Sequence, residues 1–164
     1  MVELVLVSIL TFLVTTLFGQ VVHWSLHQKW TGRLNKSHMT HHLLLYPVSS
    51  FKSERYRDPG EDSSAKIFLV AALPLLSIPI LLFCLGKFSL LATLWAIGES
   101  LILGWLHDSI HDSFHLYKSW WAKLPGYKRW AKLHYIHHVD MQKNFGIFTF
   151  FWDRTFRTLR EKLY

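Results

Sequence analysis

The apolar residues of this chain gather in three long blocks instead of following a helical or alternating period. Residues 4–22, 67–85 and 88–106 are each rich in Leu, Ile, Val, Phe and Ala. A helix of that length reaches roughly 28 Å, close to the hydrocarbon core of a bilayer at about 30 Å. A chain of 164 residues is too short to bury three such helices in a soluble core. The pattern predicts an all-α integral membrane protein with about three transmembrane helices.

The first block is expected to be an anchoring helix and not a cleaved signal peptide. No basic residue precedes it, it carries Glu3, and it runs into His23 without a small-residue cleavage site. We expect this helix to continue through His23 and His27 and to break at Thr31-Gly32. A second helical stretch then carries the next histidines, at residues 38–42.

The remaining segments are expected to connect and cover these helices. Residues 47–64 are rich in Pro, Ser and charged residues and predict a loop over the lipid headgroups. Pro74 and Pro79 should bend the second span. The aromatic tail, residues 144–158, is expected to pack as a lid against the histidine-bearing segments or the membrane surface. No internal repeat is evident, and we expect residues 1–164 to form a single domain.

The distribution of positive charge predicts the orientation in the membrane. Of 18 Lys and Arg, seven lie between His23 and Lys66, ten lie between His107 and Tyr164, and Lys87 alone lies in the turn between the second and third blocks. The positive-inside rule then makes the histidine-bearing side cytoplasmic. The excess of +7 predicts contact with anionic headgroups, and no motif indicates nucleic-acid binding. The lone Cys84 offers neither a disulfide nor a thiolate-rich metal site.

All eleven histidines fall in four clusters, at residues 23–27, 38–42, 107–115 and 134–138. Their spacings of three, four and eight residues stack side chains on one face of a helix. Neutral imidazole is a common ligand of transition metals. Zinc needs only three or four ligands, so about ten imidazoles indicate two redox-active metals. The sequence therefore predicts a helical, histidine-rich metal domain at the cytoplasmic face.

Several motifs together resemble a known family. They are His111-xxx-His115, His134-Tyr-Ile-His137-His138, the Asn144-Phe-Gly turn and the run that begins Phe151-Trp-Asp. With the two earlier clusters, they resemble the fatty acid hydroxylase/sterol desaturase superfamily of membrane di-iron oxygenases, most closely its fatty acid and sphingolipid-acyl hydroxylases. The boxes are also similar to those of carotenoid hydroxylases. The resemblance covers residues 23 to about 159.

The resemblance implies a set of ten metal ligands. They are His23, His27, His38, His41, His42, His111, His115, His134, His137 and His138. His107 is an extra histidine that could be a ligand, a hydrogen-bond donor to one or a proton carrier. Asp108 and Asp112 are candidate acceptors for ligand N–H groups, with solvated helix-end acids as the alternative. Asn144 could orient a metal-bound water or shape the turn before Gly146.

Three further residues have open or structural roles at this level. Trp152 and Asp153 are expected to serve in packing and capping. Glu99, eight residues before His107, is either a helix-end carboxylate near water or a buried acid near the metal site or substrate channel.

The resemblance also implies the function. We expect oxygen-dependent hydroxylation of a lipid C–H bond, of a fatty acid or acyl lipid, at a centre of two iron ions, with O2 as cosubstrate. Zinc is possible in the purified protein. The expected partners are a lipid taken from the bilayer and an external electron donor, a reductase or small redox protein. The alternatives are a desaturase, a carotenoid or sterol hydroxylase, or a membrane metal-binding protein without catalysis.

Overall fold

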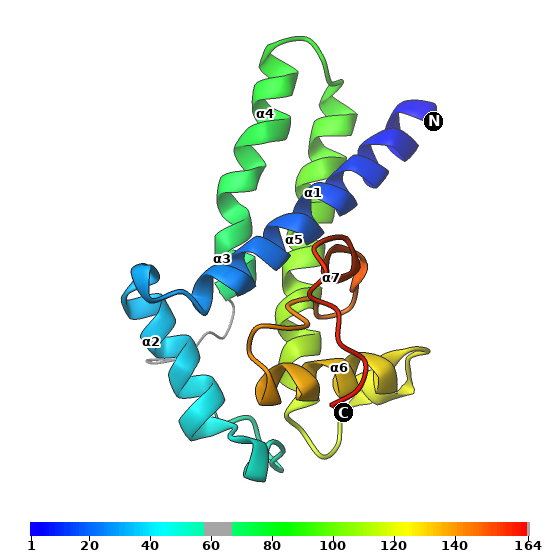
Figure 1. Ribbon diagram of the computed structural model, residues 1–164. Coiled ribbons are helices and arrows are strands. Elements are labelled where there is room, and N and C mark those ends of the chain that lie inside the picture. Colours follow the sequence, from blue (N-terminus) through cyan, green and yellow to red (C-terminus); the bar gives the residue numbers. More distant parts are fainter. Residues whose placement is uncertain (58–66, 164) are drawn as a thin grey trace. The chain divides into compact units, whose positions relative to one another are not determined.

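The structure is a computed structural model, and it describes residues 1–57 and 67–163. Every element in these ranges is helical (Figure 1). The elements are α1 Val2–Leu26, η1 Lys29–Thr31, α2 Arg33–Thr40, η2 His41–Leu45, η3 Val48–Ser50, α3 Ile67–Ala72, η4 Leu73–Leu76, α4 Ser77–Cys84, α5 Leu90–Phe114, η5 Trp120–Lys123, α6 Tyr127–Val139 and α7 Phe151–Thr155. The expected all-α class is confirmed. The end of the predicted headgroup loop, residues 58–64, lies outside the described residues.

The chain divides into two compact units. The first contains Met1–Gly19 and Lys66–Asp108, and the second contains Gln20–Ala65 and Ser109–Tyr164. Two of the three boundaries, after Gly19 and after Asp108, fall inside the long helices α1 and α5. The single-domain expectation stays a prediction.

The first unit packs the start of α1 against the start of α5. Val7 is buried with Ala92 and Ala96, and these small side chains let the two helices approach closely. The Glu3 carboxylate accepts hydrogen bonds from the backbone N–H and the hydroxyl of Ser89, at 3.1 Å each, just before α5 begins. An acid at a helix N-terminus is stabilised by the helix dipole. These contacts fix the pairing of α1 and α5 within this unit.

Two helices of the described chain are long and apolar enough to cross a membrane. They are α1, with mean hydropathy 2.2, and α5, with mean hydropathy 1.4. Both expose large apolar side chains, including Leu6 at 55% and Leu91 at 60%. Such exposure is costly in water but ordinary against lipid. The first and third predicted spans thus correspond to long apolar helices, although α1 ends at Leu26 and leaves His27 in the following turn.

The second apolar block forms a shorter and interrupted helix. Its described apolar stretch is Val70–Cys84, and Pro74 lies within the 3₁₀ turn η4 that separates α3 from α4. Proline lacks the N–H needed to continue an α-helix, which accounts for the 3₁₀ turn at Pro74. Pro79 lies within α4, and the bends expected at the two prolines stay a prediction. Figure 1 shows α4 beside α5 as the two arms of a hairpin, joined through Gly86 at a φ of 65°. The three-span count stays a prediction.

The second unit contains α2, η2, α6 and the C-terminal tail. The tail packs on α6 through a cluster in which Leu133, Ile136 and Phe150 are buried and Leu159 and Leu163 are partly buried. Ten of the eleven histidines belong to this unit.

Candidate metal centre

Nine buried or half-buried histidines of the second unit form two groups. In each group one ring nitrogen per residue lies within 4.8 Å of the others. Group one is His23, His27, His38, His42 and His137. Group two is His41, His115, His134 and His138. Each group offers enough donors to hold a metal ion on its own.

The spacing of the histidines explains how two groups arise. The pattern HxxxH followed by HxxHH occurs twice, over residues 23–42 and over residues 111–138. In each HxxHH the first and last rings join one group, and the middle ring joins the other: His41 lies in group two and His137 in group one. Consecutive helical residues point about 100° apart, so neighbouring histidines face different centres.

The turn η2 begins at His41 and has π-helical geometry. Such turns are rare within helices and are frequent at functional sites. Here the turn follows α2 directly and carries both His41 and His42, whose ring centroids lie 5.4 Å apart. The local widening of the helix thus coincides with the point at which the chain divides its rings between the two groups.

Backbone carbonyl groups fix the tautomers of four rings. The Nδ1 atoms of His23 and His137 lie 2.6 Å from the carbonyl oxygens of Phe145 and Lys143. His115 and His138 make the same contact with the carbonyls of Phe51 and Tyr46, at 3.1 and 3.0 Å. A carbonyl oxygen can only accept, so Nδ1 donates its hydrogen and Nε2 keeps its lone pair when the ring is neutral. This orientation is the usual one for a metal-binding histidine.

Burial keeps these rings neutral. It lowers the pKa of His27 from 6.5 to about 4 and that of His138 to about 3. Burial, followed by repulsion from neighbouring imidazoles, also holds the pKa of His38, His42 and His134 well below 6.5. A proton on one of these buried rings would create a charge out of reach of water, and a second protonated ring nearby would repel it. The rings whose pKa is lowered are therefore neutral donors at pH 7.

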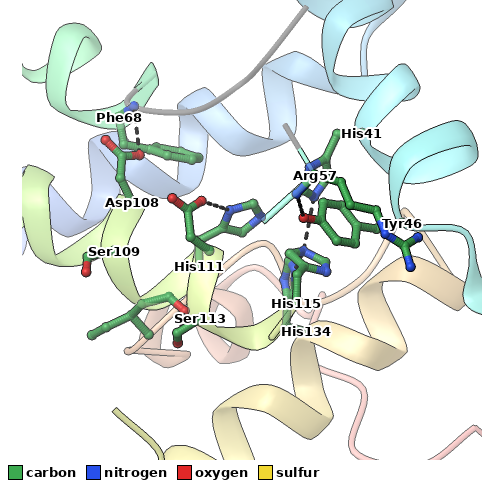
Figure 2. Close-up of polar contacts among 12 residues, drawn as sticks. His41, Tyr46, Arg57, Phe68, Asp108, Ser109, His111, Ser113, His115 and His134 are labelled. Carbon is green, nitrogen blue, oxygen red and sulfur yellow. Dashed lines mark hydrogen bonds and ion pairs between the residues drawn. The ribbon is translucent and has the colours of Figure 1, made fainter. Parts of the chain in front are cut away.

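The nitrogen atoms themselves fit a metal ion. The Nε2 atom of His115 lies 3.1 Å from the Nε2 atoms of both His41 and His134 (Figure 2). In group one the Nε2 atom of His38 lies 3.0 Å from that of His27 and 3.1 Å from that of His42. Lone pairs that converge at this distance repel unless a proton or a cation lies between them. A neutral imidazole has only one N–H, so few hydrogens are available to lie between these nitrogen atoms. A bound metal cation would satisfy the lone pairs of each cluster.

His111 lies beside group two. Its ring centroid is 4.7 Å from that of His134, 5.0 Å from that of His41 and 6.4 Å from that of His23 in group one. Its Nδ1 atom lies 3.5 Å from a carboxylate oxygen of Asp112, the next residue of the chain. The acceptor role expected of Asp112 stays a prediction. The repeated spacing makes His111 the counterpart of His23.

His107 and Asp108 belong to the first unit. The His107 ring stacks on Phe68 at a centroid distance of 3.7 Å, and a Cβ added at Gly19 would lie 3.4 Å from the same ring. Asp108 accepts a hydrogen bond from the Phe68 backbone N–H at 3.3 Å. Neither residue is a member of group one or group two. Both have structural contacts to the start of α3.

We expect His107→Phe to keep the full iron content of the wild-type protein. Phenylalanine preserves the stacking on Phe68 but has no nitrogen to offer a metal. Iron per chain, measured by mass spectrometry after anaerobic loading with Fe(II), checks this. Loss of about half the iron would instead identify His107 as a ligand, as one of the sequence-based alternatives has it.

Glu99 lies in the middle of α5, so the helix-end interpretation of this acid is wrong. Its side chain is half-buried, and its Oε2 atom is buried without a hydrogen-bond partner among the described residues. The helix α5, Leu90–Phe114, continues past the acid on both sides.

Asn144 and Asp153 shape the turn that carries two of the carbonyl acceptors. Asn144, at a φ of 56°, donates to the carbonyls of Leu133 and Arg160 at 3.0 and 2.8 Å. Asp153 is fully buried and accepts from the backbone N–H groups of Phe145 and Gly146 at 2.8 Å each. These contacts give Asn144 a structural role in the turn, which is one of the two alternatives expected from the sequence. A Cβ at Gly146 would meet the Thr149 carbonyl oxygen at 2.2 Å, so only glycine fits there.

Aromatic side chains that sequence analysis did not single out enclose the rings. Tyr46 stacks on His115 at 4.1 Å, and its hydroxyl accepts from the Arg57 backbone N–H. Phe145 contacts His23, His27 and His137 at centroid distances of 5.5 to 5.8 Å. In the sequence, only the Asn144-Phe-Gly motif drew attention to Phe145, and no pattern indicated a role for Tyr46. These rings keep bulk water from the nitrogen clusters.

Comparison with known proteins identifies a family. The family model described as fatty acid hydroxylase matches residues 8–158. Comparison with curated proteins finds no match, and comparison with solved structures finds none either. The matched range includes all four histidine clusters and the turn built by Asn144 and Asp153. The chain belongs to the fatty acid hydroxylase family, within the sterol desaturase/fatty acid hydroxylase superfamily.

Proposed function

We propose that this protein is a membrane non-haem di-iron monooxygenase that hydroxylates a C–H bond of a fatty acid or acyl lipid. The observation that carries the proposal is the pair of all-histidine groups in a chain of the fatty acid hydroxylase family. In the balanced reaction, one oxygen atom of O2 enters the C–H bond and the other leaves as water. Two electrons and two protons come from outside the protein.

Ten rings would hold the two ions: the nine of groups one and two, with His111 beside group two. An iron pair supplies, when bound, the ability to activate O2 for attack on an unactivated C–H bond. The chain's own part is to present unprotonated Nε2 atoms, which the carbonyls behind His23, His115, His137 and His138 secure. Asp112, whose carboxylate lies 3.5 Å from the Nδ1 atom of His111, would orient that ring.

An apolar hollow beside group one supports a hydrocarbon substrate. It measures about 200 Å³ and is lined by Val21 and Trp24 of α1 and by Phe145 and Phe156 of the tail, with Gln20 and Thr158. An apolar cavity of roughly 150 Å³ is enough to bind benzene. Phe145 forms one wall and also touches three rings of group one. A chain segment in this hollow would lie one aromatic side chain away from the nitrogens of group one.

The remaining parts of the proposal concern the membrane. The protein is multi-pass, with the metal centre on the cytoplasmic side, because the basic residues flank the apolar blocks there. Its lipid substrate enters from the bilayer, and its electrons come from a separate reductase or small redox protein. Desaturation, or hydroxylation of a carotenoid or sterol ring, uses the same centre, and product analysis separates these outcomes.

The test is expression in a lipid-producing host, followed by purification under iron-replete conditions. We expect about two iron ions per chain and a lipid product that gains one oxygen atom. Growth under ¹⁸O2 should place the heavy isotope in that product.

A lipid that loses two hydrogens without gaining oxygen would identify a desaturase. One tightly held zinc ion with no oxygen consumption would identify a metal-binding protein. Because zinc outcompetes Fe(II) at equal supply, the metal is loaded anaerobically before assay.

A further inference from the structure

A basic hollow lies on the surface of the second unit, over the start of α6. It measures about 550 Å³ and is lined by Lys52, Lys128, Lys132, Phe51, Tyr127 and Tyr135, together with two alanines. Lys128 and Lys132 are exposed and lie on one face of α6, four residues apart. The hollow is also lined by three aromatic rings, Phe51, Tyr127 and Tyr135, which we call its aromatic floor.

The floor of the basic hollow is also a wall of the metal centre. The Phe51 ring lies 4.7 Å from the ring of His115 and 4.9 Å from that of His138, both members of group two. The Phe51 carbonyl oxygen accepts the Nδ1–H of His115 at 3.1 Å. Tyr135 packs edge-on against Phe51 at 5.2 Å. A single layer of side chains therefore separates the hollow from group two.

The charge around the hollow is of one sign. No carboxylate lines it within the described part of the chain. A neighbouring hollow shares Lys128 and Lys132 and adds Arg129 and Lys162, and its one acid, Glu161, is paired with Arg129 at 2.7 Å. Clustered charge of one sign steers partners of the opposite sign and raises their rate of association.

We propose that the basic hollow is the docking site of an acidic one-electron carrier protein, which delivers electrons to group two. The inference rests on the proposed function, because hydroxylation needs two electrons from outside. An aromatic centre with a charged rim is typical of protein interfaces, and electron-transfer encounters use small ones. A layer of anionic headgroups would neutralise the lysines equally well, but it would draw no benefit from a floor that touches the metal centre.

The experiment measures binding of an acidic [2Fe–2S] ferredoxin, in its oxidised form, to the full chain in nanodiscs of zwitterionic lipid. We expect Lys128→Glu/Lys132→Glu to weaken binding about tenfold at low ionic strength, with the difference shrinking as salt screens the charges. The control is Arg33→Glu/Lys36→Glu, an equal change of net charge on the exposed face of α2, which should bind as the wild type does. Equal binding by both variants, or equal loss in both, overturns the proposal.

Two further readouts separate the alternatives. With iron-loaded protein under anaerobic conditions, each reduced ferredoxin should reduce one Fe(III) to Fe(II), and the rate should fall about tenfold in the α6 variant only. Repeating the titration in nanodiscs that contain phosphatidylserine tests the headgroups: if anionic lipid abolishes ferredoxin binding, the hollow is a lipid contact and the proposal is wrong. Binding needs neither iron nor oxygen. Failure of the proposed function therefore appears as absent product despite intact docking.

Discussion

Replacing His137 or His138 with alanine is expected to abolish product formation while leaving the protein in the membrane. The two residues are neighbours on α6, yet His137 belongs to group one and His138 to group two. Even the outer hydrogen-bond partners of metal ligands contribute about 10- to 100-fold in affinity or activity, so we expect losses of a hundredfold or more from a ligand itself. Each variant should also yield about one of its two iron ions to a competing chelator.

Product is measured by mass spectrometry of extracted lipid, and iron is measured per chain before and after the chelator. The matched control is Val139→Ala, the next residue on the same helix, whose side chain is exposed and which belongs to neither group. Loss of both iron ions from each variant would argue against two separate centres. Unchanged product in either variant would contradict the assignment of that ring.

Sequence reasoning located the metal centre because histidine spacing obeys helix geometry. Residues three or four apart were expected to share one helix face, so each of the two HxxHH motifs was expected to act as a unit. The structure brings the first and last rings of each motif into one group, and the middle rings, His41 and His137, instead lie in the other group. Long apolar blocks were equally informative for α1 and α5, since few other structures require so many consecutive apolar residues. The family expectation is confirmed over residues 8–158.

The rest depended on contacts that no local pattern encodes. The backbone carbonyls of Phe51 and Tyr46 accept hydrogen bonds from His115 and His138. Because every residue type has such a carbonyl, the sequence does not reveal these contacts. The division of neighbouring histidines between two groups requires knowing what lies on each side of the helix. Asp153 was expected to cap and pack, and its four hydrogen bonds reach across the tail to α1. Such long-range pairing becomes visible only in the folded chain.

Asp153→Asn is expected to release iron and to destabilise the second unit. The buried carboxylate accepts from Gln20 Nε2 at 3.0 Å, from Thr158 Oγ1 at 2.7 Å and from the backbone N–H groups of Phe145 and Gly146. An asparagine has one acceptor oxygen, and its NH2 group would point at a donor. Hydrogen bonds to a charged group contribute about 1.5–3 kcal/mol each, so the loss should be on the order of 3–5 kcal/mol.

The expected release of iron follows from what this carboxylate holds in place. The turn that Asp153 fixes carries the carbonyls of Lys143 and Phe145, which orient His137 and His23 of group one. The thermal unfolding midpoint and the iron retained per folded chain measure the two effects. The control is Asp140→Asn, whose partly exposed partner is Arg160 at 2.6 Å and which should change stability by about 1 kcal/mol or less. Equal effects of the two substitutions would show that the turn held by Asp153 does not position the rings of His23 and His137. A normal iron content in a destabilised Asp153→Asn would assign this acid to folding alone, because the carbonyls would then keep His23 and His137 in place without it.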